Sequence, residues 1–257
     1  MRLDVYLVEN GFYPSRQKAQ EAIARGDVFV GGNNDSLKPS KSVCGIEPVT
    51  VSAGGERFVS NGGYKLEKAL KDFAFSPEGL VFADIGASNG GFTDCLLKRG
   101  ARKVIAIDVG ESQLDETLSR DDRVVVKDNL NARYLTAESL GGEVDGVTAD
   151  VSFISLTYIL KNVYCVLKTG GVALLLIKPQ FELNAAALNK NGMVRSVALR
   201  KSAVKKVFDY ALSVGLVPVD FTVAPIKENK NVEYVIMLKK DASFDAIDFS
   251  VVEKRVI

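Results

Sequence analysis

The chain has 257 residues, 47% hydrophobic and 25% charged, with 22 glycines and 7 prolines. These proportions are those of an ordinary folded protein and exclude collagen-like, disordered and integral membrane chains. The formal net charge is only +1, so a nucleic-acid surface would have to come from local clusters of charge rather than from an overall basic excess.

The chain contains no histidine, which excludes Ser-His and Cys-His nucleophiles, histidine-bound metals and an imidazole general base. Cys44, Cys95 and Cys165 are widely spaced and form no C-x-x-C pair. We therefore expect neither a disulfide framework nor a bound metal, and a reducing cytoplasm fits. The longest apolar run, 172–177, is too short to cross a bilayer, and the start of the chain has no apolar signal region. No membrane partner is expected, and the sequence carries no signal for an oligomeric state.

Residues 1–59 predict a small α+β module. Its expected elements, in chain order, are two short helices within residues 2–26, a strand at 28–30, a turn at 31–34 and a second strand at 49–51. Ala53-Gly54-Gly55 predicts a linker, and a helix over 64–75 leads into a different pattern.

From residue 79 onward apolar runs alternate with helical segments. The expected strands are 80–83, 104–107, 124–126, 144–149 and 172–177, joined by helices at 92–99, 112–119 and 154–167. Connections of that length need crossovers, so the strands should be parallel. A helix at 197–213 precedes two strands, 217–223 and 232–238, which we expect to close the sheet as a hairpin-like pair. Residues 60–257 thus predict a Rossmann-like α/β domain with a seven-stranded, mostly parallel sheet.

A glycine-rich turn directly follows the first of these strands and opens a helix. It reads Asp84-Ile85-Gly86-Ala87-Ser88-Asn89-Gly90-Gly91-Phe92, and Asp108-Val109 ends the next strand. Glycines there let the backbone approach a ligand, and a strand-end acid suits the two hydroxyls of an adenosine ribose. We interpret these residues as a nucleoside cofactor site. A tight turn with an exposed aspartate is the alternative.

Two positions in the turn bear on which cofactor it takes. Where a dinucleotide site needs a second glycine to approach a pyrophosphate, this chain has Ser88, and the acid Asp84 is expected to point into the same turn. A negative group favours the cationic amino and sulfonium groups of S-adenosyl-L-methionine over NAD. Asp128-Asn129, after the third strand, is expected beside the adenine, and a solvated loop is an equal alternative.

Four further polar residues are expected near the carboxyl edge of the sheet, where open parallel sheets place their sites. Asp150 ends the fourth strand and Lys178 the fifth, Glu233 starts the last, and Lys65 lies in the helix before the first. A lysine held by carboxylates beside a ribose 2′-hydroxyl can orient it and stabilise the developing oxyanion. Taken singly, such strand-end charges are more often solvated.

The chain also carries motifs spread over nearly its whole length. They are Arg2-Leu3-Asp4 with Ser15-Arg16 and Ala19, Gly62-Gly63-Tyr64-Lys65-Leu66, residues 84–94, Asn131-Ala132-Arg133, Asp150-Val151-Ser152-Phe153-Ile154-Ser155, Ile177-Lys178-Pro179-Gln180-Phe181-Glu182, and Glu233-Tyr234. In these motifs the chain resembles the TlyA-type (haemolysin A-like) ribosomal RNA 2′-O-methyltransferases, which join an S4 RNA-binding domain to an FtsJ-like, class I methyltransferase domain.

The resemblance implies a Lys-Asp-Lys-Glu catalytic tetrad, which by position is Lys65, Asp150, Lys178 and Glu233. It also implies a ribosomal cytidine as the target, and the length of the chain resembles that of the shorter members, which act on 23S rRNA only. At the junction this chain has Asn61 where relatives commonly have arginine, so we assign Asn61 no role.

The predicted RNA contacts fall in two segments. Residues 1–59 hold seven basic and seven acidic residues, so the RNA role of Arg2, Arg16, Lys18 and Arg25 rests on the resemblance, and a solvated helix face is an equal alternative. Residues 190–206 contain six basic and no acidic residues, which predicts a one-signed surface for phosphate. Its expected contacts are Arg195, Arg200, Lys201 and Lys205.

Three rival functions share part of this pattern. A base methyltransferase would share the cofactor turn but needs an aromatic acceptor motif after the fourth strand, of which Asp150-Val151-Ser152-Phe153 is only an echo. A non-catalytic RNA-binding assembly factor would keep the fold for its shape. A cytolysin, suggested by the family's older name, finds no amphipathic or spanning segment to support it.

Overall fold

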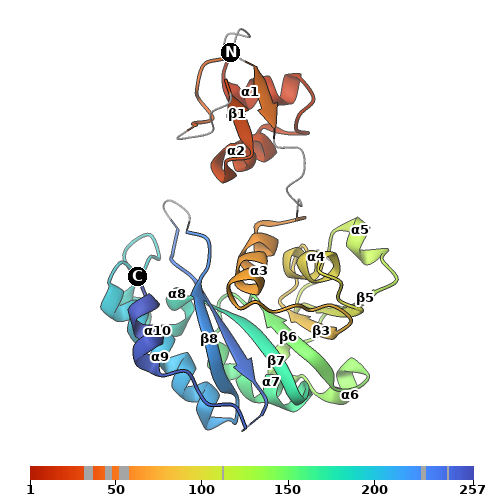
Figure 1. Cartoon of the computed structure of the whole chain (residues 1–257), viewed down its shortest axis with the longest axis vertical. Coiled ribbons are helices and arrows are strands. Elements are labelled where there is room, and N and C mark those ends of the chain that lie inside the picture. Colours follow the sequence, from red (N-terminus) through yellow and green to blue (C-terminus); the bar gives the residue numbers. More distant parts are fainter. Residues whose placement is uncertain (32–36, 44–47, 52–57, 112, 227–229, 242) are drawn as a thin grey trace. The chain divides into compact units, whose positions relative to one another are not determined.

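The computed structural model describes the chain except residues 32–36, 44–47, 52–57, 112, 227–229 and 242. The chain forms two compact units, Met1–Arg57 and Phe58–Ile257, which we describe one at a time (Figure 1). The sequence predicts the border after residue 59, and Phe58 lies in the core of the larger unit. The predicted linker 53–55 and residues 32–34 of the predicted turn lie outside the described residues.

The small unit has the predicted two helices and two strands. They are α1 (Leu3–Glu9), α2 (Arg16–Arg25), β1 (Val28–Val30) and β2 (Val49–Val51), and the two strands pair antiparallel. Helix α2 begins where Ser15 accepts a hydrogen bond from the Lys18 amide, and it ends at Gly26 in the left-handed conformation, with φ of 79°. Apolar side chains from all four elements, among them Leu3, Ile23 and Val28, form the core.

Asp4 joins the two helices of this unit through a buried carboxylate. It accepts two hydrogen bonds from Arg2, one of 3.0 Å from Arg16 and one of 2.7 Å from Gln20. The hydrogen bonds from Arg2 hold the pKa of Asp4 well below its usual range, against the opposing effect of burial. Two of the predicted RNA contacts, Arg2 and Arg16, therefore also stabilise the fold of the small unit.

The large unit is built on a seven-stranded sheet with the order β5-β4-β3-β6-β7-β9-β8. Its strands are β3 (Val81–Ile85), β4 (Lys103–Ile107), β5 (Val124–Lys127), β6 (Val144–Ala149), β7 (Leu167–Ile177), β8 (Val217–Val223) and β9 (Tyr234–Lys239). All neighbours pair parallel except β9, which is antiparallel to both β7 and β8. This confirms the predicted mostly parallel sheet, closed by a final antiparallel pair.

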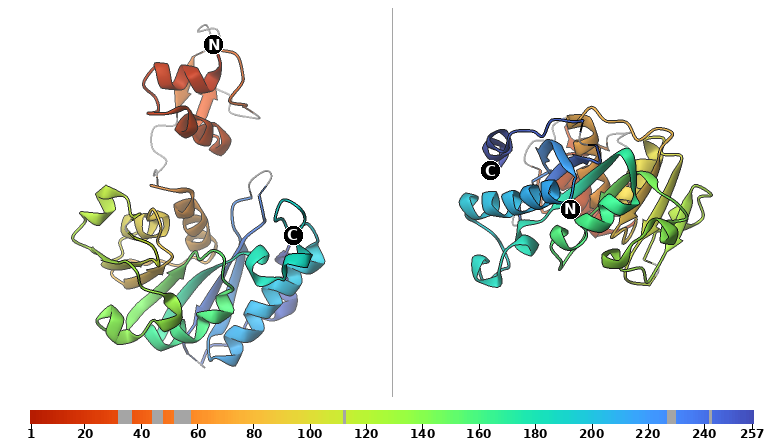
Figure 2. Two further views of the ribbon diagram at one scale, coloured as in Figure 1. Left: turned by 180° about the vertical axis from the view of Figure 1, so that it is seen from behind. Right: turned by 90° about the horizontal axis from the view of Figure 1, so that it is seen from below.

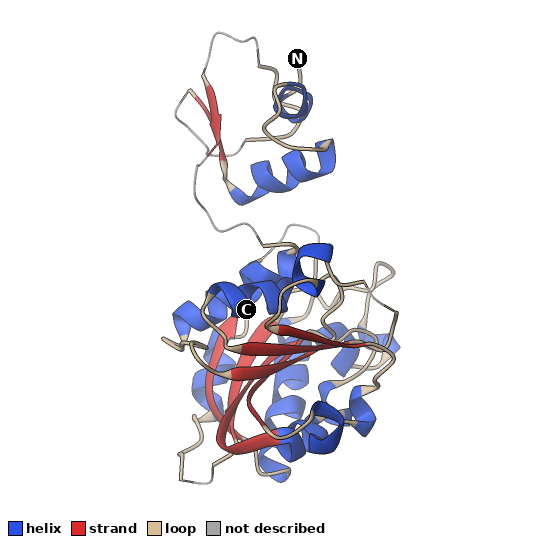
Figure 3. Cartoon of the chain, turned by 90° about the vertical axis from the view of Figure 1, so that its right-hand side faces the viewer, coloured by secondary structure: helices blue, strands red, loops and turns tan. Residues whose placement is uncertain are grey.

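Helices cover both faces of this sheet (Figure 2, Figure 3). They are α3 (Asn61–Asp72), α4 (Gly91–Lys98), α5 (Glu116–Ser119), α6 (Ala137–Leu140), α7 (Leu160–Val166), α8 (Pro179–Glu182), α9 (Val197–Ser213) and α10 (Phe249–Arg255), with 3₁₀ helices η1 (Ala132–Tyr134), η2 (Leu156–Tyr158) and η3 (Ala185–Ala187). Alternate strand residues face two cores: Phe82 belongs to a core with side chains of α3 and α4, whereas Ala83 belongs to a core that also includes side chains of α7, α9 and α10.

Several helical segments differ from the sequence prediction. The helix expected at 154–167 is divided into η2 and α7. The one expected at 112–119 starts later than predicted: α5 begins at Glu116, where Asp115 accepts a 2.9 Å hydrogen bond from the Thr117 amide. Helices α6 and α8 were not predicted, and neither was α10. Asp248 caps it by accepting a 2.7 Å hydrogen bond from the Ser250 amide, and its buried Val252 packs into the core.

Helix α3 begins at Asn61, three residues before its predicted start, and includes two glycines that disfavour a helix. Close packing explains them. A Cβ on Gly63 would lie 2.3 Å from the Phe58 ring, and one on Gly91 in α4 would lie 2.2 Å from the Ser60 hydroxyl. The glycines let α3 and α4 approach closely, which places the first helix of the domain beside the glycine-rich turn.

The topology brings distant residues to one edge of the sheet. Strands β3 and β6 are neighbours, but the chain leaves them in opposite directions along the sheet, and a cleft forms at such a point. Because β9 runs antiparallel, Tyr234 at its start pairs with Ile177 at the end of β7. Glu233 therefore reaches the same edge as Lys178.

Asp84, near the end of β3, is fully buried and joins three elements of the large unit. Its carboxylate accepts hydrogen bonds of 2.7 Å from the Thr93 hydroxyl of α4 and 2.9 Å from the Thr148 hydroxyl of β6. Burial raises the pKa of Asp84 to about 6, although the two hydroxyls favour its charged form.

We expect stability to depend on pH through Asp84. An acid whose pKa is raised in the folded state stabilises the fold most at low pH, and this contribution is lost as pH rises from about 4 through about 6. A rise of about two pKa units corresponds to about 3 kcal/mol. The free energy of unfolding in urea, measured for the wild type and Asp84→Asn from pH 4 to 7.5, should show the wild type losing about this much relative to the variant. A pH-independent difference would refute the raised pKa.

Candidate functional site

Four side chains meet at the carboxyl edge of the sheet, as predicted. Lys178 Nζ lies 2.6 Å from an oxygen of Asp150, whose other oxygen lies 3.6 Å from Lys65 Nζ. Lys65 Nζ in turn lies 2.6 Å from Glu233. Lysines and carboxylates thus alternate along a chain from α3, the ends of β6 and β7, and the start of β9.

This cluster is largely shielded from solvent. Its four side chains are between 10% and 20% exposed. Burial by itself would lower the pKa of Lys65, but the carboxylates of Asp150 and Glu233 outweigh burial and raise it. Lys65 therefore stays charged and holds the two carboxylates together, while Lys178 lies at the end of the chain of ion pairs, next to the cleft.

Ser152 and Phe153, which follow Asp150, also belong to the site, although we did not assign them to it from the sequence. Ser152 accepts a 2.8 Å hydrogen bond from Lys178 Nζ. Phe153 has a φ of 63° and a ring that is 91% exposed, 5.1 Å from the ring of Phe181. A bulky residue in the left-handed region is strained, and such strain concentrates at functional sites. No pattern in the sequence indicates this backbone conformation of Phe153.

Two adjoining cavities, of about 340 and 220 Å³, form the cleft beside this cluster, and both are lined by Gly86, Ser88, Asp150 and Ser152. In the larger cavity the Asp108 carboxylate accepts hydrogen bonds of 2.8 Å from the Ser88 amide and 3.0 Å from the Gly110 amide. Each oxygen keeps a further lone pair, so Asp108 can also accept from two ligand hydroxyls.

Most of the predicted cofactor residues line this cleft. They are Gly86, Ala87, Ser88, Gly91, Phe92, Asp108, Val109 and Asp150. Gly90 acts indirectly: it caps α4 with φ of 90°, and a Cβ there would lie 2.4 Å from Leu118. Leu130 and Asn131, which were not predicted, also line the larger cavity.

The remaining predicted cofactor residues line neither cavity. Both carboxylate oxygens of Asp84 accept hydrogen bonds from threonine hydroxyls beneath the turn. In this geometry the carboxylate does not face a ligand in the cleft. Asp128 and Asn129 are exposed outside the cleft, and Asn129 has a φ of 58° that turns the chain there. Their proximity to an adenine remains a prediction.

Three of the four RNA contacts predicted on 190–206 have partners in the fold, so this surface is not purely basic, and their contact with RNA remains a prediction. Arg200 donates to the backbone oxygens of Val194, Arg195 and Ile257. The side chains of Lys201 and Lys205 pair with acids outside the segment, at 3.5 Å from Glu253 and 2.8 Å from Asp209. Arg195 is exposed, and its RNA contact remains a prediction. In the small unit Lys18 lies 3.7 Å from Glu21, and the side chain of Arg25 lies outside the described residues.

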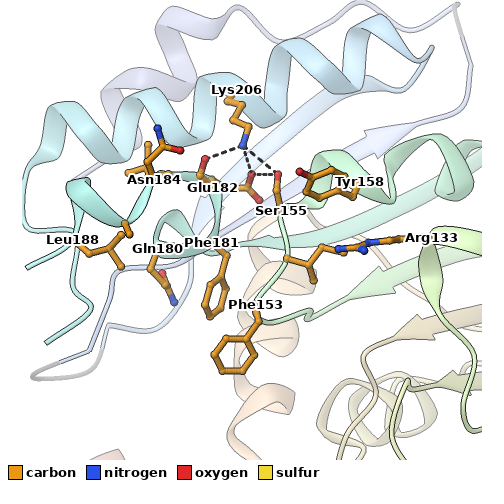
Figure 4. A pocket seen from close by; sticks show the side chains of 13 residues that line it. Arg133, Phe153, Ser155, Tyr158, Gln180, Phe181, Glu182, Asn184, Leu188 and Lys206 are labelled. Atoms are coloured by element: carbon orange, nitrogen blue, oxygen red, sulfur yellow. Dashed lines mark hydrogen bonds and ion pairs between the residues drawn. The ribbon is translucent and has the colours of Figure 1, made fainter.

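A third, open cavity of about 520 Å³ lies beyond Phe153, which also lines the cleft (Figure 4). Phe181 and the 63% exposed ring of Tyr158 line it, and the Arg133 guanidinium lies 5.1 Å from the centre of the Tyr158 ring. Aromatic faces beside cations suit stacked bases and phosphates.

Neither a membrane span nor a metal centre is found where the structure describes the chain. No described helix has the length and hydropathy needed to cross a bilayer, and the described acids and cysteines form no cluster that could hold a metal ion.

Residues 58–240 match the model of the FtsJ-like methyltransferases, and residues 1–33 match the S4 domain. The 16S/23S rRNA (cytidine-2′-O)-methyltransferase TlyA of Mycobacterium tuberculosis is 40% identical, and the match covers 93% of this chain and 89% of the relative's length. Hemolysin A of Brachyspira hyodysenteriae is 41% identical, and the match covers 91% of this chain and 98% of the relative's length. A solved structure named as a hemolysin, from Streptococcus thermophilus, covers 100% of this chain and 94% of its own at 34% identity, with a TM-score of 0.76. The chain therefore belongs to the FtsJ-like methyltransferase family, in its TlyA-type, haemolysin A-like branch with an S4 domain.

Proposed function

We propose that the protein transfers the methyl group of S-adenosyl-L-methionine to the ribose 2′-oxygen of a cytidine in ribosomal RNA. The observation that carries this proposal is the Lys65–Asp150–Lys178–Glu233 cluster beside the cleft. We propose that the target lies in 23S rRNA, because the relatives from Mycobacterium tuberculosis and Campylobacter jejuni are both named for it, the former together with 16S rRNA. Such an enzyme works where ribosomes are, so we place it in the cytoplasm.

The cleft suits an adenosine-containing methyl donor. The Asp108 carboxylate, with its spare lone pairs, is placed to accept hydrogen bonds from both ribose hydroxyls, and the backbone of Gly86 to Ser88 lines the path toward Asp150. When bound, the cofactor supplies an electrophilic methyl group on a sulfonium.

The reacting hydroxyl belongs near Lys178. A 2′-hydroxyl is a weak nucleophile: as its bond to the methyl group forms, the bond between that methyl group and sulfur breaks, and the hydroxyl proton passes to solvent water in the open cleft. The Lys178 ammonium, oriented by Asp150 and Ser152, can hold the oxygen and stabilise its developing negative charge. Lys65 and Glu233 hold the Asp150 carboxylate in place, so the lysine keeps its orientation when RNA enters.

The cavity beyond Phe153 is where we place the substrate RNA. Phe153 and Tyr158 offer exposed aromatic faces to unpaired bases, the half-buried Phe181 lies against Phe153, and Arg133 offers a charge to a phosphate. Phe181 lies beside the reacting lysine, with the centre of its ring 5.9 Å from Lys178 Nζ, whereas Lys201 and Lys205 of α9 pair with acids. We therefore expect recognition near the site to depend on stacking more than on net charge.

We expect Lys178→Ala to keep cofactor binding and to abolish transfer. Losing the group that stabilises the oxyanion should lower kcat by at least about 100-fold, with the cofactor Kd unchanged in calorimetry. Lys168→Ala is the matched control: Lys168 lies on the same strand at the opposite end and pairs with Asp145 at 2.6 Å. Full activity in Lys178→Ala would exclude the 2′-O assignment, and no binding at millimolar cofactor to the wild type would favour a non-catalytic assembly factor.

We expect ribosomal RNA from cells that contain the protein to carry a 2′-O-methylcytidine that is missing from cells lacking it. Mass-spectrometric mapping of ribose methylation in both ribosomal RNAs measures this. A single site in 23S rRNA supports the proposal as stated, and a second one in 16S rRNA would extend it to both subunits. A base modification, or no change, would contradict it.

A further inference from the structure

The reacting groups leave the sheet on two adjacent loops. Asp150, Ser152 and Phe153 follow β6, whereas Lys178 and Phe181 follow β7. The two strands pair in register up to Ala149 opposite Leu175, and the ladder between them ends there. Beyond that point, side-chain contacts have to keep the loops aligned.

Glu182 makes such a contact between the loops. Its side chain is only 1% exposed. One carboxylate oxygen accepts a 2.8 Å hydrogen bond from the Leu156 amide, the first N–H of η2, and the other accepts one from the Ser155 hydroxyl. The end of the loop after β7 is thereby fastened to the loop after β6, three residues past Ser152.

Lys206 makes the burial of this carboxylate possible. It reaches from α9, lies 3.5 Å from the Glu182 carboxylate, and donates to the Glu182 backbone oxygen at 2.8 Å and to the Ser155 hydroxyl at 3.4 Å (Figure 4). Burying a charge without a partner is costly, so the lysine stabilises the arrangement. Glu182, Ser155 and Lys206 form what we call the loop clamp.

The loops are thus joined at two places. Lys178 meets Asp150 and Ser152 next to the cleft, and the loop clamp joins them again about four residues further along each loop. Between the two junctions lie Phe153, with its strained backbone, and Phe181. Because the two loops are joined at both places, the strained Phe153 and the ion pair of Lys178 are held in one geometry. One junction alone would leave the loops free to shift.

We propose that Glu182 is a positioning residue for methyl transfer. It touches neither cofactor nor reacting atoms, and it sets the alignment of Lys178 with Ser152 and of Phe153 with Phe181. This proposal rests on the proposed function and adds to it a residue outside the tetrad.

The test compares Glu182→Ala with Asp145→Ala. Asp145 is a matched control because it too accepts a backbone N–H, from Val81 at 2.9 Å, and pairs with a lysine, at the other end of the sheet. Misalignment should lower kcat of Glu182→Ala about 10- to 100-fold, with the cofactor Kd within about twofold. Asp145→Ala should keep kcat within about twofold at a comparable loss of melting temperature. Glu182→Gln, which keeps an acceptor for Leu156, should recover most of the rate.

Hydrogen exchange gives a readout that does not need activity. The Leu156 amide should exchange at least about tenfold faster in Glu182→Ala than in the wild type or Asp145→Ala. If Glu182→Ala does not fold, Ser155→Ala, which removes only one partner, should still lower kcat at least about threefold.

The proposal is overturned if Leu156 keeps its wild-type exchange rate, if the clamp variants keep kcat within twofold, or if Asp145→Ala loses as much rate. A wild type that binds cofactor but methylates no ribosomal RNA would instead overturn the proposed function, while the exchange measurement still decides whether Glu182 fixes the loop.

Discussion

The ion pair between Lys178 and Asp150 is the interaction on which the site depends. The two residues follow neighbouring parallel strands, so they leave the sheet at the same edge and within 2.6 Å of each other. In a place so shielded from solvent, neither charge is tolerated without the other. Lys65 and Glu233 extend the pair to four alternating charges, and this balance allows a lysine to lie next to a cleft with a fixed orientation.

Two other buried carboxylates support this cluster. Asp84 lies beneath the glycine-rich turn and joins β3, α4 and β6 through two threonine hydroxyls. Glu182 joins the loops after β6 and β7 through a hydroxyl and an amide. In both cases one carboxylate accepts hydrogen bonds from segments that are far apart in the sequence. Backbone pairing cannot join these segments, because the strands have ended.

Several of the residues predicted to contact RNA pair with acids of the same unit. Asp4 pairs with Arg2 and Arg16 in the small unit, and the basic residues of α9 pair with Asp209, Glu253 and Glu182 in the large one. Exposed aromatic rings next to the cleft, above all Phe153 and Tyr158, are therefore the stronger indication of an RNA-facing surface.

The sequence by itself determined the features that depend on short segments. The apolar runs predicted all seven strands of the large unit and the bounds of β6, β8 and α9, because the spacing of apolar residues in a segment depends on which of its side chains face the core. The glycine turn, Asp108, Asp150 and Lys178 were also readable, because the ends of parallel strands share one edge of the sheet, whereas the tetrad with Lys65 and Glu233 was implied by the family resemblance.

Only the tertiary structure decided the rest. Nothing local to Asp84 says that two threonines will bury its carboxylate, and nothing in 190–206 says that Glu253 will pair with Lys201. The positive φ of Phe153 arises between two junctions whose partners lie some 26 residues away, at Lys178 and Glu182. Pattern and propensity describe a residue's own segment, whereas burial, ion pairing and backbone strain depend on segments that meet only in the folded chain.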